Sequence, residues 1–193
     1  MLRHRWQPQV HHLSFRPRRA TIAAAICERT VYLNLLRKYV ALCELSLLGY
    51  CLMSNHVHLL VVPHQGDSLA RALKQTHGRY ACYWNATHRS SGRVWQGRFY
   101  SCPLDQSHLW MALRYVELNP VRAGLASRAE LWPWCSTAVH CGDTQDRLGL
   151  ELRAWKERWS QENWKEYLGT GEKLGEIAAI RRCTHTGRPL GAE

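Results

Sequence analysis

The sequence predicts an α+β fold of the ferredoxin-like type, a four-stranded antiparallel sheet with two helices on one face. Two observations support this prediction. Hydrophobic patterning follows the order β-α-β-β-α-β over residues 11–102, which is the element order of that fold. Residues 57–62 are nearly all β-branched or leucine, as expected for a buried strand. At 193 residues, the chain is long enough for one such domain and an appendage.

The elements of this fold follow from periodicity and from turn residues. Apolar residues recur at three- and four-residue spacing in the helices. Pro63 and Gly66 end the third strand, and Asp67 or Ser68 caps the second helix. The predicted strands are residues 11–15, 44–51, 57–62 and 94–102, and the predicted helices are residues 21–43 and 67–84.

Two histidines stand at the start of the third predicted strand. Successive side chains of a strand point to opposite faces, so His56 and His58 share a face, with Cβ atoms about 6.5–7 Å apart. Two imidazoles at this spacing can bind one divalent ion from one side. Taken alone, such a pair is more typical of histidines that stack or hydrogen bond in a core. Because the first and third strands are central in this fold, both histidines are expected in the middle of the sheet.

A third helix is predicted to begin at Asp105 or Ser107. Pro120 is expected to end it, because the residue before proline is disfavoured in helical conformation. Tyr115 and Asn119 are four residues apart and therefore lie on one helix face. A half-buried tyrosine beside a capping asparagine is the ordinary interpretation. Together with the histidines, Asn119 becomes a candidate third metal ligand and Tyr115 a candidate nucleophile.

Phosphoryl transfer is the reaction that this set of residues favours. A phenol ionises only at about pH 10, so a tyrosine needs help to attack at neutral pH. A cation held by His56, His58 and Asn119 would polarise a scissile phosphate and offset the charge that develops during displacement. Tyr115 would then become covalently attached to DNA, which conserves the energy of the phosphodiester for later rejoining.

The chain is strongly basic. It has 26 Lys and Arg against 15 Asp and Glu, which gives a formal net charge of +11 and a pI ≈ 9.6. This charge predicts a polyanionic partner and salt-dependent binding, and a merely soluble basic protein is the alternative. Nine Trp and eight Tyr favour nucleic acid, because aromatic faces stack on unpaired bases.

Cysteine spacing and hydropathy indicate in which cellular compartment the protein is found. The eight cysteines contain no C-x-x-C pair, so we expect buried free thiols and neither a zinc site nor a disulfide framework. The apolar run at residues 22–26 is too short to cross a membrane, and no signal peptide is recognised. We therefore expect a cytoplasmic protein with no membrane partner.

Four motifs occur in one order: residues 53–60 (MSNHVHLL), 94–99 (VWQGRF), 114–125 (RYVELNPVRAGL) and 132–136 (WPWCS). With these motifs the chain resembles the REP-associated tyrosine transposases, which are similar to the single-tyrosine transposases of the HUH endonuclease superfamily. The resemblance spans roughly residues 10–140. The four motifs in this order are highly specific evidence for the family, whereas the H-x-H motif alone is weak evidence.

The resemblance implies a ferredoxin-like DNA transposase or endonuclease that uses Mg²⁺ or Mn²⁺. His56 and His58 match the two-histidine motif and Tyr115 the nucleophile. Asn119 matches the third ligand, where related insertion-sequence transposases have glutamine. The resemblance also implies binding of single-stranded or hairpin-forming repetitive extragenic palindromes, cleavage through a 5′-phosphotyrosine, and strand transfer. A monomer is favoured over a domain-swapped dimer.

Basic and aromatic side chains are assigned to DNA contact. Residues 15–19 (FRPRR) stand where relatives have an Arg-Gly-Asn-like turn, so the chain departs from the family pattern there. The predicted DNA-binding residues are Arg16, Arg18, Arg19, Trp95, Arg98 and Arg122.

The chain is divided after residue 125, with the catalytic domain at residues 1–125 and a helical C-terminal appendage at residues 126–193. The appendage is expected either to bind the stem of a DNA hairpin or to pack as a cap on the core. It is expected to contain a short helix at residues 176–183, a loose tail after it, and an earlier helix with its apolar stripe at Leu148, Leu152, Trp155 and Trp159.

Two other functions are open. A non-catalytic, sequence-specific DNA-binding regulator would keep the scaffold and form no adduct between tyrosine and DNA. A metal hydrolase fits less well, because metallo-β-lactamase-like sites need H-x-H-x-D-H. Here Leu60 and Val61 follow the second histidine, and histidine-triad enzymes need a histidine at position 60.

Overall fold

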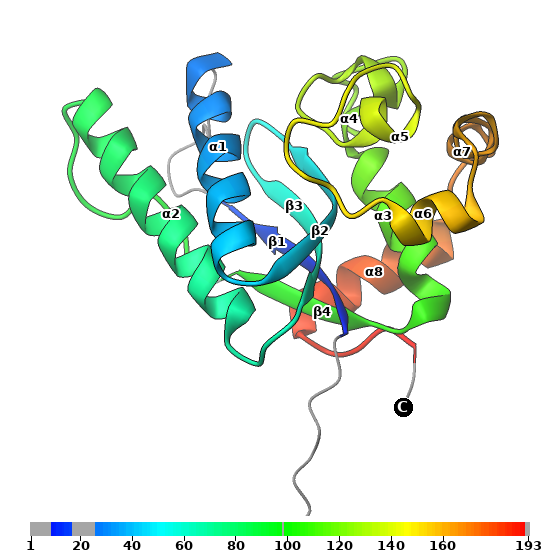
Figure 1. Cartoon of the computed structure of the whole chain (residues 1–193), viewed down its shortest axis with the longest axis horizontal. Helices are drawn as coiled ribbons and strands as arrows, with labels where there is room; N and C mark the ends of the chain where they lie inside the picture. Colours follow the sequence, from blue (N-terminus) through cyan, green and yellow to red (C-terminus); the bar gives the residue numbers. More distant parts are fainter. Residues whose placement is uncertain (1–8, 17–25, 98, 192–193) are drawn as a thin grey trace, which may run out of the picture.

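A four-stranded antiparallel sheet runs through the computed structural model, which describes residues 9–16, 26–97 and 99–191. The strand order is β2-β3-β1-β4, with β1 and β3 as the central pair (Figure 1). This order confirms the ferredoxin-like prediction. The strands are β1 (Val10–Phe15), β2 (Leu45–Leu52), β3 (Val57–Pro63) and β4 (Tyr100–Leu104).

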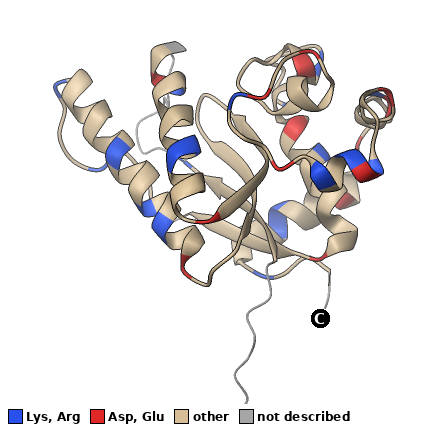
Figure 2. Ribbon diagram, in the orientation of Figure 1, with Lys and Arg blue, Asp and Glu red and all other residues tan. Residues whose placement is uncertain are grey.

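Two long helices, α1 (Ile26–Leu42) and α2 (Ser68–Thr87), cover one face of the sheet (Figure 1). Alternate residues of the central strands point toward them, so Leu13 of β1 and Leu59 of β3 are almost fully buried beneath the helices. Burial of such side chains is the main stabilising term for this layer. Lys and Arg lie along the outer sides of both helices, and others lie on the C-terminal helix (Figure 2).

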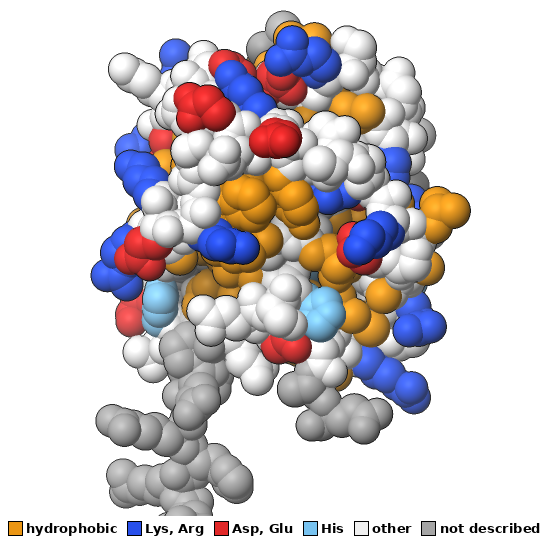
Figure 3. All heavy atoms as spheres, turned by 90° about the vertical axis from the view of Figure 1, so that its right-hand side faces the viewer, with side chains coloured by type: hydrophobic (Ala, Val, Ile, Leu, Met, Phe, Trp, Pro, Cys, Tyr) orange, Lys and Arg blue, Asp and Glu red, His pale blue; other side chains and the backbone are white. Residues whose placement is uncertain are grey.

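The second face of the sheet is covered by α3 (Leu109–Glu117) and α8 (Leu174–Thr186). Outside them lie two shorter helices, α6 (Arg153–Arg158) and α7 (Gln161–Gly169) (Figure 1). Figure 3 views this side and shows hydrophobic side chains gathered at its centre. No helix in the described part of the chain is long and apolar enough to cross a bilayer.

The fourth strand differs from the sequence prediction. Residues 94–102 were expected to form it, but β4 is Tyr100–Leu104. Its pairing with β1 starts at Ser14 opposite Tyr100, near the C-terminal end of β1. Before that point Trp95 packs toward the helices, where its indole N–H donates to the His77 carbonyl at 3.0 Å. Pro103 is tolerated because β4 is an edge strand.

The tyrosine helix also ends differently from the prediction. A 3₁₀ turn, η1 (Gln106–His108), comes first, and the Asp105 carboxylate caps it by accepting from the His108 backbone N–H at 3.0 Å. The helix α3 stops at Glu117, and a short helix, α4 (Asn119–Arg122), follows after Leu118. Pro120 therefore lies in the first turn of a new helix, where its missing N–H costs nothing.

The C-terminal segment is more ordered than predicted. Of the helix expected from Leu148 to Trp159, only Arg153–Arg158 is helical, as the short α6, and α7 was not predicted. The helix expected at residues 176–183 is the longer α8, and the expected loose tail pairs with β4 through Leu190, whose N–H donates to the Pro103 carbonyl at 2.9 Å. Two further short helices are η2 (Ala129–Leu131) and α5 (Thr137–His140). The division at residue 125 stays a prediction.

The cysteine prediction is confirmed in part. All eight cysteines are free thiols, and six of them are buried. Cys27 and Cys82 are exposed.

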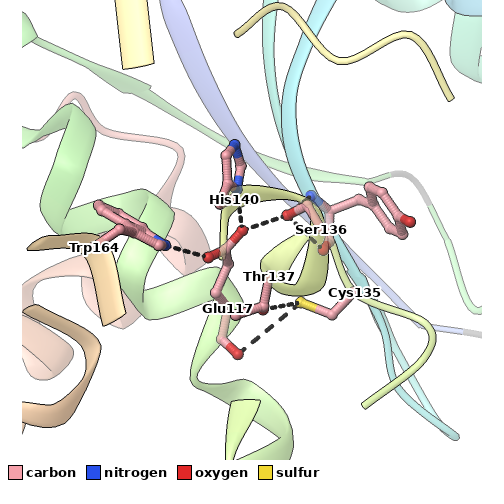
Figure 4. Close-up of polar contacts among 7 residues, drawn as sticks. Glu117, Cys135, Ser136, Thr137, His140 and Trp164 are labelled. Atoms are coloured by element: carbon pink, nitrogen blue, oxygen red, sulfur yellow. Dashed lines mark hydrogen bonds and ion pairs between the residues drawn. The ribbon is translucent and has the colours of Figure 1, made fainter. Parts of the chain in front are cut away.

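A buried carboxylate fixes the end of α3 (Figure 4). Glu117 is fully buried, and its two oxygens accept from the Ser136 hydroxyl and His140 Nδ1, both at 2.6 Å, and from Trp164 Nε1 at 2.9 Å. The Ser136 hydroxyl in turn accepts from the Tyr50 backbone N–H of β2 at 3.1 Å. The carboxylate thus joins α3 to the sheet, to α5 and to α7.

Close packing between α3 and β2 accompanies this network. Gly49 of β2 lies against α3, and a Cβ at this position would collide with the Leu113 side chain. The absence of a side chain at Gly49 therefore sets how closely the tyrosine helix approaches the sheet.

We predict that Glu117→Gln destabilises the protein by about 3 kcal/mol, because an amide NH₂ would face buried donors that now bond a carboxylate. Urea unfolding at pH 7 measures the change. The matched control is Glu166→Gln on the exposed side of α7, which should stay within about 0.5 kcal/mol of wild type. Equal effects of the two substitutions would contradict the role given to Glu117.

Candidate active site

A pocket of about 440 Å³ opens on the α3 side of the sheet, between β1, β3, α4 and α8. It combines segments that are far apart in the sequence. Six residues that were singled out from the sequence line it: Arg16, His56, His58, Tyr115, Asn119 and Arg122.

The two histidines enter this pocket from β3. His56 immediately precedes the strand and His58 is its second residue, with ring centroids 4.7 Å apart and planes nearly perpendicular. His56 Nδ1 lies 2.6 Å from Asn55 Oδ1, and His58 Nδ1 lies 3.0 Å from His12 Nε2. In both rings Nδ1 has a partner within the chain, which leaves Nε2 as the nitrogen available to a ligand.

Both imidazoles are neutral at pH 7. Burial is the largest cause that lowers the pKa of His56 to about 4, followed by the charges of Arg16 and Arg122, while a hydrogen bond to the Asn119 side chain acts in the opposite direction. Burial also holds the pKa of His58 well below its ordinary value. Neutral imidazole is the form that binds metals.

Tyr115 reaches the same pocket from α3. Its ring centroid is 5.7 Å from that of His58, and the planes are nearly perpendicular. The Arg122 guanidinium lies over the tyrosine ring at 4.3 Å, and its Nη2 donates to the Tyr115 carbonyl at 2.6 Å. Arg122 is also ion-paired with Glu172. Stacking and pairing of this kind hold the ring in one orientation.

Asn119 completes the group from the first turn of α4. Its amide nitrogen donates to the carbonyls of Tyr115 at 3.1 Å and Val116 at 3.2 Å, so both amide hydrogens are used. The expected capping role is therefore present, and Oδ1 is the acceptor of the carboxamide toward the His56 side chain.

The donor set fits a small divalent ion. His56 Nε2, His58 Nε2 and Asn119 Oδ1 would be neutral ligands, and the other polar atoms of these side chains are already bonded, as is typical of metal sites. Within the described residues, no three His, Cys, Asp or Glu side chains form a metal-binding group.

The remaining predicted DNA-binding residues are placed differently. Trp95 does not line the pocket, because its ring stacks on His77 with centroids 4.3 Å apart, on the other face of the sheet. Arg16 is exposed at the pocket rim. Arg18, Arg19 and Arg98 lie outside the described residues.

Seven residues that sequence reasoning did not single out also line the pocket, among them His12 of β1 and Arg181, Thr184 and His185. His12 shares the face of Ser14, which pairs with His58 in the register of β1 and β3. Alternation along the first strand was a usable signal for His12. The last three of those named come from α8, and nothing in the sequence indicated that this helix returns to the sheet.

Two solved structures are similar to this chain. Among solved structures, a REP-associated tyrosine transposase bound to a REP hairpin is 13% identical and has a TM-score of 0.61, with 77% of this chain and 90% of that one covered. A candidate transposase from Deinococcus radiodurans R1 is 16% identical over 60% of this chain and 93% of that one, with a TM-score of 0.44. No curated protein matches.

The first of these structures shares the fold, in agreement with the resemblance drawn from the motifs. The model of the IS200-like transposases matches residues 5–119, which is more than half of the chain. The chain therefore belongs to the family of IS200-like transposases.

Proposed function

We propose that this protein is a metal-dependent DNA transposase or endonuclease that cleaves single-stranded or hairpin-forming repetitive palindromic DNA and rejoins the strands. One observation carries the proposal. Tyr115 lies in one pocket with His56, His58 and Asn119 of the same chain. Membership of a transposase family supports the same class of reaction.

In the proposed cleavage step, the Tyr115 phenolic oxygen attacks the scissile phosphorus. A bond forms between tyrosine and phosphorus, the bond to the 3′-oxygen breaks, and the phenol proton passes to solvent. The products are a free 3′-hydroxyl and a 5′-phosphotyrosine. In strand transfer a 3′-hydroxyl attacks this linkage and releases the tyrosine, so the number of phosphodiester bonds is conserved.

His56, His58 and Asn119 would hold Mg²⁺ or Mn²⁺ when it is bound, and the ion would supply charge stabilisation at the scissile phosphate. Imidazole ligands favour Mn²⁺ over Mg²⁺. Arg122 orients the tyrosine through its contact with the ring and with the backbone carbonyl.

The pocket also has groups suited to the DNA backbone. Arg16, Arg181 and His185 are exposed at its rim and come from β1 and α8. No acidic residue lines the pocket among the described residues. Phosphates are therefore attracted to the site, and affinity is expected to fall with salt.

A single chain supplies both the histidines and the tyrosine, which supports a monomer rather than a domain-swapped dimer. We infer DNA as the partner and the cytoplasm as the location.

We predict that Tyr115→Phe abolishes covalent attachment to DNA while DNA binding stays within about threefold of wild type, because only the attacking oxygen is lost. The substrate is a single-stranded oligonucleotide that folds into a palindromic hairpin, labelled at its 3′ end and incubated with Mn²⁺. Because the downstream fragment stays on the tyrosine, wild type should give a protease-sensitive shifted band on a denaturing gel.

Tyr100→Phe is the matched control, because Tyr100 is an exposed residue of β4 that does not line the pocket. This variant should form the adduct normally. An adduct with Tyr115→Phe would contradict the assigned nucleophile. If wild type binds hairpins but forms no adduct with any of a panel of them, the alternative of a non-catalytic DNA-binding regulator is favoured.

We further predict that Arg181→Ala lowers the affinity for single-stranded DNA several-fold and reduces the salt slope by about 0.7, the value for one phosphate contact. Titrations by fluorescence anisotropy at several salt concentrations measure both quantities. Arg182→Ala is the matched control, because Arg182 is the next residue of α8, is also exposed and does not line the pocket. Equal losses for the two variants would show that only net charge matters.

A further inference from the structure

His12 of β1 lies next to His58 and lines the same pocket. It is 1% exposed and contacts two of the site residues. Its ring stacks against His58 with centroids 5.1 Å apart and meets the Tyr115 ring edge-on at 5.6 Å. A buried histidine in contact with both a candidate ligand and the candidate nucleophile needs a role, and the predicted mechanism gives it none.

Hydrogen bonds place His12 in the middle of a three-member chain. His58 Nδ1 lies 3.0 Å from His12 Nε2, and His12 Nδ1 lies 2.9 Å from the Thr184 hydroxyl of α8. All three side chains are buried. This row of hydrogen bonds begins at His58 in the centre of the sheet and ends at Thr184 on α8, a helix that lies beyond residue 125.

The direction of these bonds decides what His58 presents to the pocket. A neutral imidazole has one N–H and one acceptor nitrogen. If His58 Nδ1 donates to His12 Nε2, then His12 Nδ1 donates to Thr184, and His58 Nε2 has a free lone pair. If instead the Thr184 hydroxyl donates to His12 Nδ1 and His12 Nε2 donates to His58 Nδ1, then His58 Nε2 carries the proton and cannot bind a metal.

We infer that His12 is a positioning residue: it accepts the Nδ1 proton of His58 and donates to Thr184, which fixes His58 in the tautomer whose Nε2 is a metal ligand. This inference rests on the proposed function for the metal site that His58 Nε2 would complete. Metal-bound histidines commonly donate their other nitrogen to a carboxylate, a carbonyl or water. In this protein the acceptor for the His58 Nδ1–H is a second imidazole, that of His12.

The first test reads the tautomer directly. Two-bond ¹H–¹⁵N spectra of the full chain at pH 7, with and without Mg²⁺, should show His58 protonated at Nδ1 and unprotonated at Nε2. Thr184→Val should raise the population of the other tautomer, because His12 Nδ1 then has no acceptor. A wild-type His58 protonated at Nε2 with Mg²⁺ present overturns the inference.

The second test measures Mn²⁺ binding to the full chain by electron paramagnetic resonance, without DNA. His12→Leu should weaken binding by about 10–100-fold, the range for lost supporting partners of metal ligands. His12→Gln restores an acceptor near His58 Nδ1 and should recover part of the loss. Equal affinities for wild type and His12→Leu overturn the inference.

His11→Leu is the matched control. His11 is the neighbouring residue of β1, pairs opposite Val61 of β3 and bonds Ser101 at 3.0 Å. Its substitution should leave Mn²⁺ affinity unchanged, and circular dichroism verifies that each variant is folded. A misfolded His12→Leu leaves the decision to His12→Gln and Thr184→Val. If wild type binds no Mn²⁺, the proposed metal site fails, and the tautomer spectrum still decides the role of His12.

Discussion

The placement of the tyrosine helix against the sheet depends on one buried carboxylate. Glu117 is two residues from Tyr115, and it bonds three side chains from two other segments, α5 with its N-cap and α7. A carboxylate is stable in such an interior only when its oxygens are fully bonded. The network therefore tolerates little movement of α3, and it fixes the distance between a phenol on a helix and two imidazoles on a strand.

The electrostatics of the pocket follow from what surrounds the histidines. Arginines approach them from β1 and α4, and burial removes water from both rings. These conditions disfavour an imidazolium, so the rings stay neutral beside cations that attract phosphate. The arginine charges therefore act with burial to keep both imidazoles neutral, and they would also attract the phosphates of the proposed DNA partner.

Much of this arrangement was predictable from local sequence. Strand alternation predicted that His56 and His58 share a face, and both line one pocket; helical spacing predicted that Asn119 accompanies Tyr115. The limits of β4 were not predictable, because they depend on where β1 ends and on packing of Trp95 against His77. Thr184 and Arg181 were missed for a related reason: their role depends on the return of α8 to the sheet, which is a long-range packing event with no periodic signature.

The hydrogen bond between His12 and Thr184 joins residues separated by 172 positions. The chain is synthesised from its N-terminus, so β1 is made well before α8. A nascent chain that has not yet reached α8 therefore has the histidines and the tyrosine without the complete support behind them. The pocket is finished only after α8 has been made and has packed on the sheet.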